Sequence, residues 1–471
     1  MPLAAVDFDY PLTFVLGVLV LLGLITEACY KNRRAWSIPS LLVYVTVGTW
    51  YFGNMISDGP TAFSAKFGPS LTDEALWQVI LFLVAYRTAA FYLHSQHNTP
   101  GATVSVSSRF SQDTLTSFFF PLALLWVILF VIGLARAGWQ LAAIIWPPSS
   151  GGKVGLFTRD GIGQGADFLV STGAYLYMVV CSSFGVLTIL SRGSVRLLAG
   201  SLFLFVTPYF VFERARSGIL AFLLPVIVCY LVATWGQWWK KAVVSAASLA
   251  VLTLWFGQVM HSRGDSGENR TSAMLEATST EDSGGLLGLD MLTELCYMDA
   301  FVQDGSFKPN WGQRYFAELA NVVPRSLWYN KPLIGYDYAY ARGYRDVSTG
   351  SEDAVYATIS TGVIGQGIAN FGRFFGVIAA ALLMSGWTVI LSKLWQRRFE
   401  LPRFMLFTVG CGLTFNLGRD ITLLVLWPFV FAYGSVRIFE KLGPKKVFAT
   451  RRPVPVRRLR RTSVPRISNP L

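Results

Sequence analysis

Residues 316–332 read Phe-Ala-Glu-Leu-Ala-Asn-Val-Val-Pro-Arg-Ser-Leu-Trp-Tyr-Asn-Lys-Pro. They belong to residues 261–356, the one long polar stretch in a chain that otherwise consists of successive apolar runs. This stretch also holds a large share of the acidic residues, arginines and tyrosines. Because membrane-spanning runs on both sides would fix its two ends at a membrane, we expect residues 261–356 to form a loop that covers an active site at one membrane face.

The composition around this loop is that of a membrane protein. Of the 471 residues, 53% are hydrophobic and only 14% are charged, whereas soluble domains have about 25% charged residues. Apolar runs of about 18 residues recur along the chain, and each can cross a hydrocarbon core of about 30 Å as a helix. The runs are continuous rather than alternating, which favours helices over a barrel. The sequence therefore predicts an all-α polytopic membrane protein.

Hydropathy places about eleven transmembrane helices. They are expected at residues 10–28, 36–54, 75–94, 115–134, 168–190, 197–212, 218–235, 242–260, 374–395, 404–417 and 421–439. The chain is thus divided into eight helices in residues 1–260, a large loop with short helices in residues 261–356, three helices in residues 357–440, and a basic tail in residues 441–471. Within the loop, residues 289–302 have helical periodicity, with Leu292 and Leu295 on one side and Glu294 and Asp299 displaced from it.

The distribution of positive charge predicts the orientation. Lysines and arginines collect in alternate short connections and in the tail, and such residues lie on the cytoplasmic side. We therefore expect a cytoplasmic carboxyl terminus, with the amino terminus and the large loop outside. The formal net charge of +13 then comes mainly from a tail held near anionic lipid headgroups, which argues against a nucleic-acid partner.

Several common catalytic patterns are missing from the sequence. No pair of the five cysteines has metal-site spacing, and no phosphate-binding glycine loop or serine nucleophile elbow is found. We therefore expect neither a metal nor another cofactor.

Arginines lie at the ends of several predicted spans on the outer side. They are Arg214 and Arg216 in one tight turn, Arg419 in a second, and Arg263, with His261, after the eighth span. Short outer turns are usually poor in arginine, so these need a local reason. In one interpretation Arg214 pairs with Glu213 and Arg419 with Asp420, or the arginines bind ordinary lipid phosphates. In the other they form one site for an anionic headgroup such as a lipid diphosphate, which guanidinium groups bind through paired hydrogen bonds.

The general base has several candidates. His261 can take a proton from an attacking sugar hydroxyl, a contribution of about 10² to 10⁴ in rate. Competing candidates are the loop carboxylates Asp265, Asp290, Glu294, Asp337 and Glu352. Asp337 lies in Tyr-Asp-Tyr-Ala-Tyr-Ala-Arg, residues 336–342, and tyrosines beside a carboxylate are typical of carbohydrate sites as well as of membrane interfaces.

Two segments carry a family resemblance. Residues 321–332, Asn-Val-Val-Pro-Arg-Ser-Leu-Trp-Tyr-Asn-Lys-Pro, and residues 364–376, Ile-Gly-Gln-Gly-Ile-Ala-Asn-Phe-Gly-Arg-Phe-Phe-Gly, resemble the outer loop and following helix entry of Wzy-type polymerases. These are also called O-antigen or oligosaccharide repeat-unit polymerases and are related to O-antigen ligases. Members often carry an acidic residue shortly before Asn-Phe-Gly, where this chain has Gln366 and Gly367. A catalytic carboxylate at that place is therefore in doubt.

The resemblance implies a GT-C-like glycosyltransferase of the bacterial inner membrane. Such an enzyme transfers a growing glycan from polyprenyl diphosphate onto a lipid-linked repeat unit, without a metal, and a chain-length regulator protein is a further partner. It implies that Arg214, Arg216 and Arg419 hold a diphosphate, that Arg325 with Lys331 positions the loop or a phosphate, and that His261 or a loop carboxylate activates the acceptor hydroxyl. We therefore predict catalytic roles for His261, Asp337 and Arg325, and we add Arg263, Tyr336 and Arg342 to the predicted substrate-binding residues. For Arg325 and Lys331, a role in folding the loop is an equal alternative.

Three other functions fit the same sequence. An O-antigen ligase has a similar donor but transfers the glycan to a lipid core. A flippase moves lipid-linked sugars without chemistry. An exosortase-like transpeptidase would use Cys296 as its nucleophile.

Overall fold

The structure is a computed structural model of the whole chain. It describes residues 10–30, 35–95, 110–141, 157, 167–212, 216–233, 238–265, 290–323, 327–328, 330–332, 336–342, 359–419 and 423–442. Within these ranges the ordered elements are helices, and no strand occurs. The prediction of an all-helical chain is confirmed.

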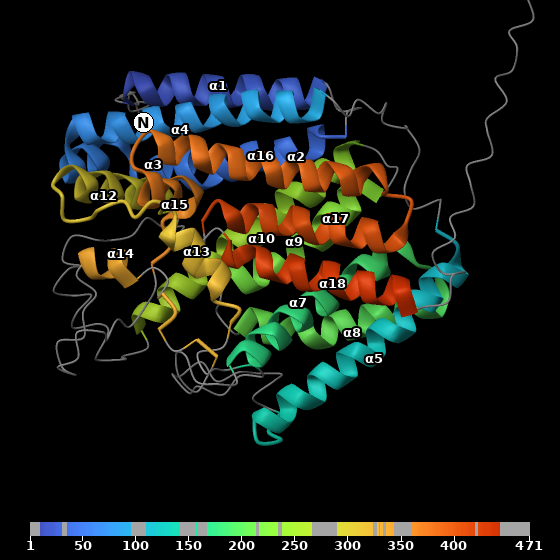
Figure 1. Cartoon of the computed structure of the whole chain (residues 1–471). Helices are drawn as coiled ribbons and strands as arrows, with labels where there is room; N and C mark the ends of the chain where they lie inside the picture. Colours follow the sequence, from blue (N-terminus) through green and yellow to red (C-terminus); the bar gives the residue numbers. More distant parts are fainter. Residues whose placement is uncertain are drawn as a thin grey trace, which may run out of the picture.

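The helices follow one another along the chain and form one bundle. Before the loop they are α1 (Leu12–Tyr30), α2 (Ser37–Val47), η1 (Gly48–Phe52), α3 (Gly53–Asp58), α4 (Pro60–Ser95), α5 (Gln112–Arg136), α7 (Asp167–Leu190), α8 (Gly193–Phe212), α9 (Arg216–Ala233) and α10 (Trp238–Asp265). Then follow α12 (Met291–Gln303), α13 (Gln313–Ala320), α14 (Tyr336–Ala341), α15 (Gly362–Phe371), α16 (Phe375–Gln396), α17 (Leu401–Leu417), η3 (Leu424–Leu426) and α18 (Trp427–Leu442). Figure 1 shows α12 to α15 gathered at one end of the long helices. We call this the loop end.

Among the described residues, six helices are long and apolar enough to cross a membrane: α1, α4, α5, α7, α8 and α16. Residues Gly218–Ala233 of α9 and Leu401–Leu417 of α17 are shorter apolar helices. A helix or helical segment lies at each of the eleven predicted positions, and the apolar helices indicate a helical membrane protein. The number of eleven spans, the GT-C-like arrangement and the orientation stay predictions.

Helix α17 is the central helix of the bundle. Sixteen of its 17 residues are buried, as expected for a helix that is apolar all round and surrounded by other helices. A Cβ at Gly412 would lie 2.7 Å from Pro225 on α9, so only glycine permits this approach. The enclosed position of α17 fixes the turn at its carboxyl end, which carries Arg419.

The second predicted span is not a regular α-helix. Between α2 and α3 the chain forms the π-helical segment η1, in which Trp50, Tyr51 and Phe52 are buried. The Trp50 indole donates to the carbonyl of Phe415 on α17, at 2.9 Å, and the Tyr51 hydroxyl accepts from the amide of Ile364 on α15, at 3.2 Å. Such π-helical insertions often occur beside functional sites, and here η1 connects α17 with α15.

Helices α15 and α16 form a tight hairpin at the loop end. A Cβ on Gly367 would lie 2.2 Å from the carbonyl oxygen of Gly376, so the two backbones touch where only glycine fits. The chain turns between the helices at Gly372, whose φ is 80°, in the left-handed region that glycine adopts without strain. All but the last residue of α15 are buried, which holds Gln366 and Asn370 rigidly beneath the loop helices.

Helix α12 confirms the helix predicted at residues 289–302, and it begins at Met291. The predicted displacement of its acidic residues from the buried side is wrong, because Glu294 and Asp299 are both buried. Each has polar partners that replace water. Asp299 accepts from Gln78 at 2.8 Å and from Arg373 at 3.0 Å, contacts that hold α12 to α4 and to the start of α16.

Candidate functional site

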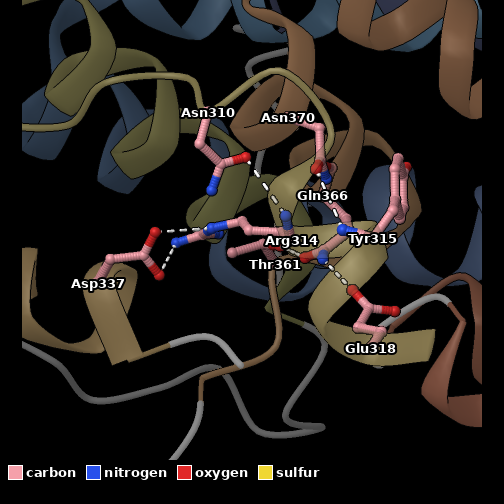
Figure 2. Close-up of polar contacts among 8 residues, drawn as sticks. All are labelled: Asn310, Arg314, Tyr315, Glu318, Asp337, Thr361, Gln366 and Asn370. Carbon is pink, nitrogen blue, oxygen red and sulfur yellow. Dashed lines mark hydrogen bonds and ion pairs between the residues drawn. The ribbon is translucent and has the colours of Figure 1, made fainter. Parts of the chain in front are cut away.

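The loop end contains a group of polar side chains that join α13 to α14 and α15. Figure 2 shows its members, which we call the loop-end cluster: Asn310, Arg314, Tyr315, Glu318, Asp337, Thr361, Gln366 and Asn370. Arg314 and Glu318 leave α13 in different directions, Arg314 toward α14 and Glu318 toward α15. Helix α13 is therefore the element that connects the two halves of the cluster.

The start of α13 is held by two asparagine side chains. The amide of Tyr315 donates to Asn370 Oδ1 at 3.2 Å, and the amide of Arg314 donates to Asn310 Oδ1 at 3.4 Å. The first amides of a helix have no partner within the helix, so these contacts supply the missing acceptors. Asn370, from the Asn-Phe-Gly motif, thus positions α13.

Glu318 joins three segments. Its side chain is fully buried, and Oε2 accepts from the amide of Leu423 at 2.6 Å. Its Oε1 accepts from the side-chain amide of Gln366, and Gln366 Oε1 in turn accepts from the Thr361 hydroxyl at 3.3 Å. These donors satisfy the hydrogen-bonding capacity of the buried carboxylate, whereas burying an unpaired carboxylate would cost much free energy. Glu318 therefore ties α13 to α15 and to the segment that follows Arg419.

The position of Glu318 bears on the missing acidic residue before Asn-Phe-Gly. Wzy-type polymerases often have an acidic residue shortly before Asn-Phe-Gly, in the region where this chain has Gln366 and Gly367. Here the fold brings Glu318 into contact with Gln366 from another helix. Glu318 was not among the site residues predicted from the sequence. Glu318 and Gln366 are 48 positions apart in the sequence, so no local residue spacing could have indicated their contact.

Arg314 and Asp337 form the other half of the cluster. Arg314 Nε donates to Asp337 Oδ2 at 2.8 Å, and the guanidinium carbon lies 4.5 Å from the centre of the Phe307 ring. Arg314 is buried, whereas the Asp337 side chain is half exposed. The predicted base thus lies at the surface of the cluster, oriented by a buried cation that the sequence analysis did not select.

Arg419 lies at the end of α17 beside the loop-end cluster. Its carbonyl accepts from the amide of Gly362 at 3.0 Å, next to Thr361 of the cluster. Its guanidinium Nε lies 3.7 Å from Asp290 Oδ1, and the group lies over the Trp50 ring at 5.6 Å. The side chain is 19% exposed. Asp420, considered as its partner from sequence, lies outside the described residues, and the described partner is Asp290, 129 positions away.

Arg342 lies in a buried contact between α12 and the end of α14. Its Nη2 is 3.2 Å from Glu294 Oε1, and its guanidinium carbon lies 3.5 Å from the centre of the Tyr297 ring. The Tyr338 hydroxyl donates to Glu294 Oε2 at 2.5 Å. These contacts give Arg342 and Glu294 a common role in holding α14 on α12.

We expect the stability of the folded loop to fall as the pH rises, because the buried Glu294 then has to ionise. Burial raises the pKa of Glu294 above its ordinary value of 4.5, and Arg342 and Tyr338 offset this only in part. A raised pKa means that the folded state holds the proton more tightly, so stability is full below pH 4.5 and is lost as the pH rises through the raised pKa. A tenfold difference in proton affinity between the folded and unfolded states corresponds to about 1.4 kcal/mol. Hydrogen exchange of α12 and α14, corrected for intrinsic rates, measures the loss.

The control is Glu294→Gln, which we expect to reduce the pH dependence without removing it. Burial also raises the pKa of Asp299, so that residue contributes a second slope of the same sign. An unchanged slope in Glu294→Gln would contradict the assignment to Glu294.

Lys331 contacts the backbone of its own loop. Its ammonium group donates to the carbonyls of Asn321, at 3.2 Å, and Val323, at 3.0 Å. These contacts favour the loop-folding interpretation of this residue.

Several predicted site residues cannot be placed. Arg214, Arg325 and Glu352 lie outside the described residues, as do the side chains of Arg216, His261, Arg263, Asp265 and Tyr336, whose backbones belong to α9, α10 and α14. Among the described predicted residues, the structure brings Arg419 and Asp337 to the border of one cluster, and it places Arg342 and Lys331 in internal contacts of the loop.

Two further kinds of chemistry bear on the loop end. Within the part of the chain that the structure describes, no three His, Cys, Asp or Glu residues lie close enough together to hold a metal. Cys296 is fully buried in α12, and burial raises the pKa of its thiol. A thiol that is enclosed and hard to ionise is a poor nucleophile, which argues against the transpeptidase interpretation.

Comparison with known proteins gives no assignment: no protein-family model matches the chain, nor does any curated protein or solved structure. The likeness to Wzy-type polymerases therefore stays a resemblance carried by the two quoted segments.

Proposed function

We propose that the chain is a membrane glycosyltransferase that polymerises lipid-linked oligosaccharides. It transfers a growing glycan from polyprenyl diphosphate onto the next lipid-linked repeat unit. The position of Arg419 carries the proposal. Arg419 is a partly exposed cation at the rigid end of the buried helix α17, and it lies beside the loop helices, one of which holds Asp337. On this proposal the loop end lies outside the cytoplasmic membrane and the carboxyl terminus lies in the cytoplasm.

The residues suit a displacement at a sugar carbon. A carboxylate such as Asp337, or His261, takes the proton of the acceptor hydroxyl, and the hydroxyl oxygen forms a bond to the anomeric carbon of the donor. The bond between that carbon and the diphosphate oxygen breaks, and the diphosphate leaves with the electron pair. Arg419 stabilises the charge that develops on the leaving group.

The test is a reconstituted reaction. The full-length protein in lipid nanodiscs is incubated with one lipid-linked repeat unit, and the products are separated by size. A ladder of polymers supports the proposal. Transfer of a single finished glycan to an added lipid core, without a ladder, would instead indicate a ligase. Movement of the lipid-linked sugar across a vesicle membrane, with neither product, would indicate a flippase.

We expect Asp337→Asn to lower the polymerisation rate about 10²-fold, the lower range for loss of a general base. The amide keeps the shape of the carboxylate and can still accept a hydrogen bond from Arg314, so α14 should remain in place. The measurement is the single-turnover rate of polymerisation. A rate equal to that of the unmodified protein would remove Asp337 from the reaction and leave His261.

A further inference from the structure

An apolar cavity of about 250 Å³ lies in the bundle between α5, α7, α17 and α18. Its lining carries no charged residue, and its polar side chains are those of Ser117, Ser183 and Ser435. Helix α7 packs against both α5 and α18, and the three helices run beside one another in Figure 1. The cavity therefore lies between helices in the apolar part of the protein, and none of its lining residues belongs to the loop-end cluster.

The burial of the lining residues indicates how a ligand enters. On α17, Met405, Leu406 and Val409 are buried and form the floor. On α5, Ser117 and Pro121 are exposed, and on α18 Ser435 is half-buried. The cavity thus opens sideways between α5 and α18, where a membrane protein meets lipid chains. A ligand that enters from this side is an apolar chain.

Helix α17 lines the cavity, and Arg419 lies in the turn just after its carboxyl end. The lining residues of α17 run from Pro402 to Val409. At 1.5 Å per residue, they lie about 15 to 25 Å along the helix from Arg419. A lipid whose head is bound at Arg419 would reach the cavity with a chain of that length.

We propose that this cavity holds part of the polyprenyl chain of the lipid diphosphate bound at Arg419. The proposal rests on the proposed function, and it deepens it by assigning the lipid part of the substrate to α5, α7, α17 and α18. A phospholipid acyl chain extends through half of the hydrocarbon core, about 15 Å, and ends at the near edge of the cavity. A long prenyl chain reaches its far end. By proportion with a cavity of about 150 Å³ that holds benzene, the space takes about ten carbon atoms, or about two isoprene units.

The direct test is photocrosslinking of the full-length protein in nanodiscs. The probe is a long-chain polyprenyl diphosphate with a diazirine near the far end of its chain. We expect adducts on peptides from α17 and α18, and we expect excess unlabelled polyprenyl diphosphate to abolish them. If a phospholipid with a diazirine on its acyl chain labels the same peptides, and polyprenyl diphosphate does not compete, the cavity holds ordinary bilayer lipid and the proposal fails.

A pair of variants tests the cavity itself. Ser435→Trp places a large ring at the cavity, and we expect about tenfold less crosslinking, because buried chain carbons are displaced. Val430→Trp is the matched control on the same helix, since Val430 is exposed and lies outside the lining. It should crosslink like the unmodified protein. Equal crosslinking in both variants would contradict the proposal.

The two proposals fail in different ways, because crosslinking requires no glycosyl transfer. Adducts at α17 and α18 without any polymer in the reconstituted reaction would leave the lipid site standing and overturn the polymerase function. A polymer ladder with no adducts, and with Ser435→Trp as active as Val430→Trp, would keep the function and overturn the lipid site.

Discussion

On the proposed function, Arg419→Ala should lower the rate of glycan polymerisation by about 10² to 10³, which is the usual cost of removing one preorganised group that stabilises developing negative charge. The backbone of this residue should keep its place, because its carbonyl still accepts from the amide of Gly362 and the enclosed helix α17 fixes the turn. Arg419→Lys should recover part of the rate, since lysine keeps the charge but lacks the planar fork that binds two phosphate oxygens.

The separate effects of Arg419→Ala on kcat and on KM distinguish the possible roles of Arg419. If it acts mainly on the leaving group, kcat falls; if it holds the diphosphate equally before and during the reaction, KM rises instead. Arg397→Ala is the control, because Arg397 is exposed and lies at the other end of α16 from the loop helices. Asp290→Asn removes the carboxylate charge that faces Arg419, so its effect on activity measures this internal pairing separately from substrate binding. Full activity in a folded Arg419→Ala protein would mean that Arg419 serves internal contacts, such as those with Asp290 and Trp50, and not the substrate.

The local pattern of the sequence was sufficient to place the helices but not to predict which distant residues contact them. Apolar runs placed the long helices, and periodicity placed α12, because both depend on neighbours a few residues apart. The local sequence pattern did not predict the π-helical turn at η1 or the burial of Glu294. Those depend on partners contributed by distant segments, such as Ile364 for Tyr51 and Arg342 for Glu294.

The candidate site shows the same division. Arg419 and Asp337 could be selected because a cation at a span end and a carboxylate among tyrosines are unusual locally. Arg314 and Glu318 have no such local signal, because their roles depend on contacts with residues distant in the sequence. Arg314 contacts Asp337, and Glu318 contacts Gln366 and the turn after α17. The arginine turn was predicted to pair within itself or to bind phosphate, and the fold adds a third partner, Asp290, that no spacing rule connects to it.

Glu318→Ala should detach α13 from the bundle, with a loss of about 3 kcal/mol in local stability. The substitution leaves the amide of Leu423 and the side-chain amide of Gln366 without the acceptor they have now, and each unpaired buried donor costs about 1 to 3 kcal/mol. Hydrogen exchange of the α13 amides should then accelerate by about 10², and the Tyr315 amide, held by Asn370, should report it clearly.

Two further variants decide whether the acceptor or the packing of Glu318 matters. Glu318→Gln keeps an oxygen for the Leu423 amide, so most of the protection should return. Leu319→Ala changes the adjacent residue on the exposed side of α13 and should leave exchange unchanged. Because Leu423 follows Arg419 by four positions, loss of Glu318 should also lower activity through a displaced Arg419. Protected α13 amides in Glu318→Ala would show that Asn310 and Asn370 suffice to hold the helix and that the carboxylate is not the link between the loop and the turn.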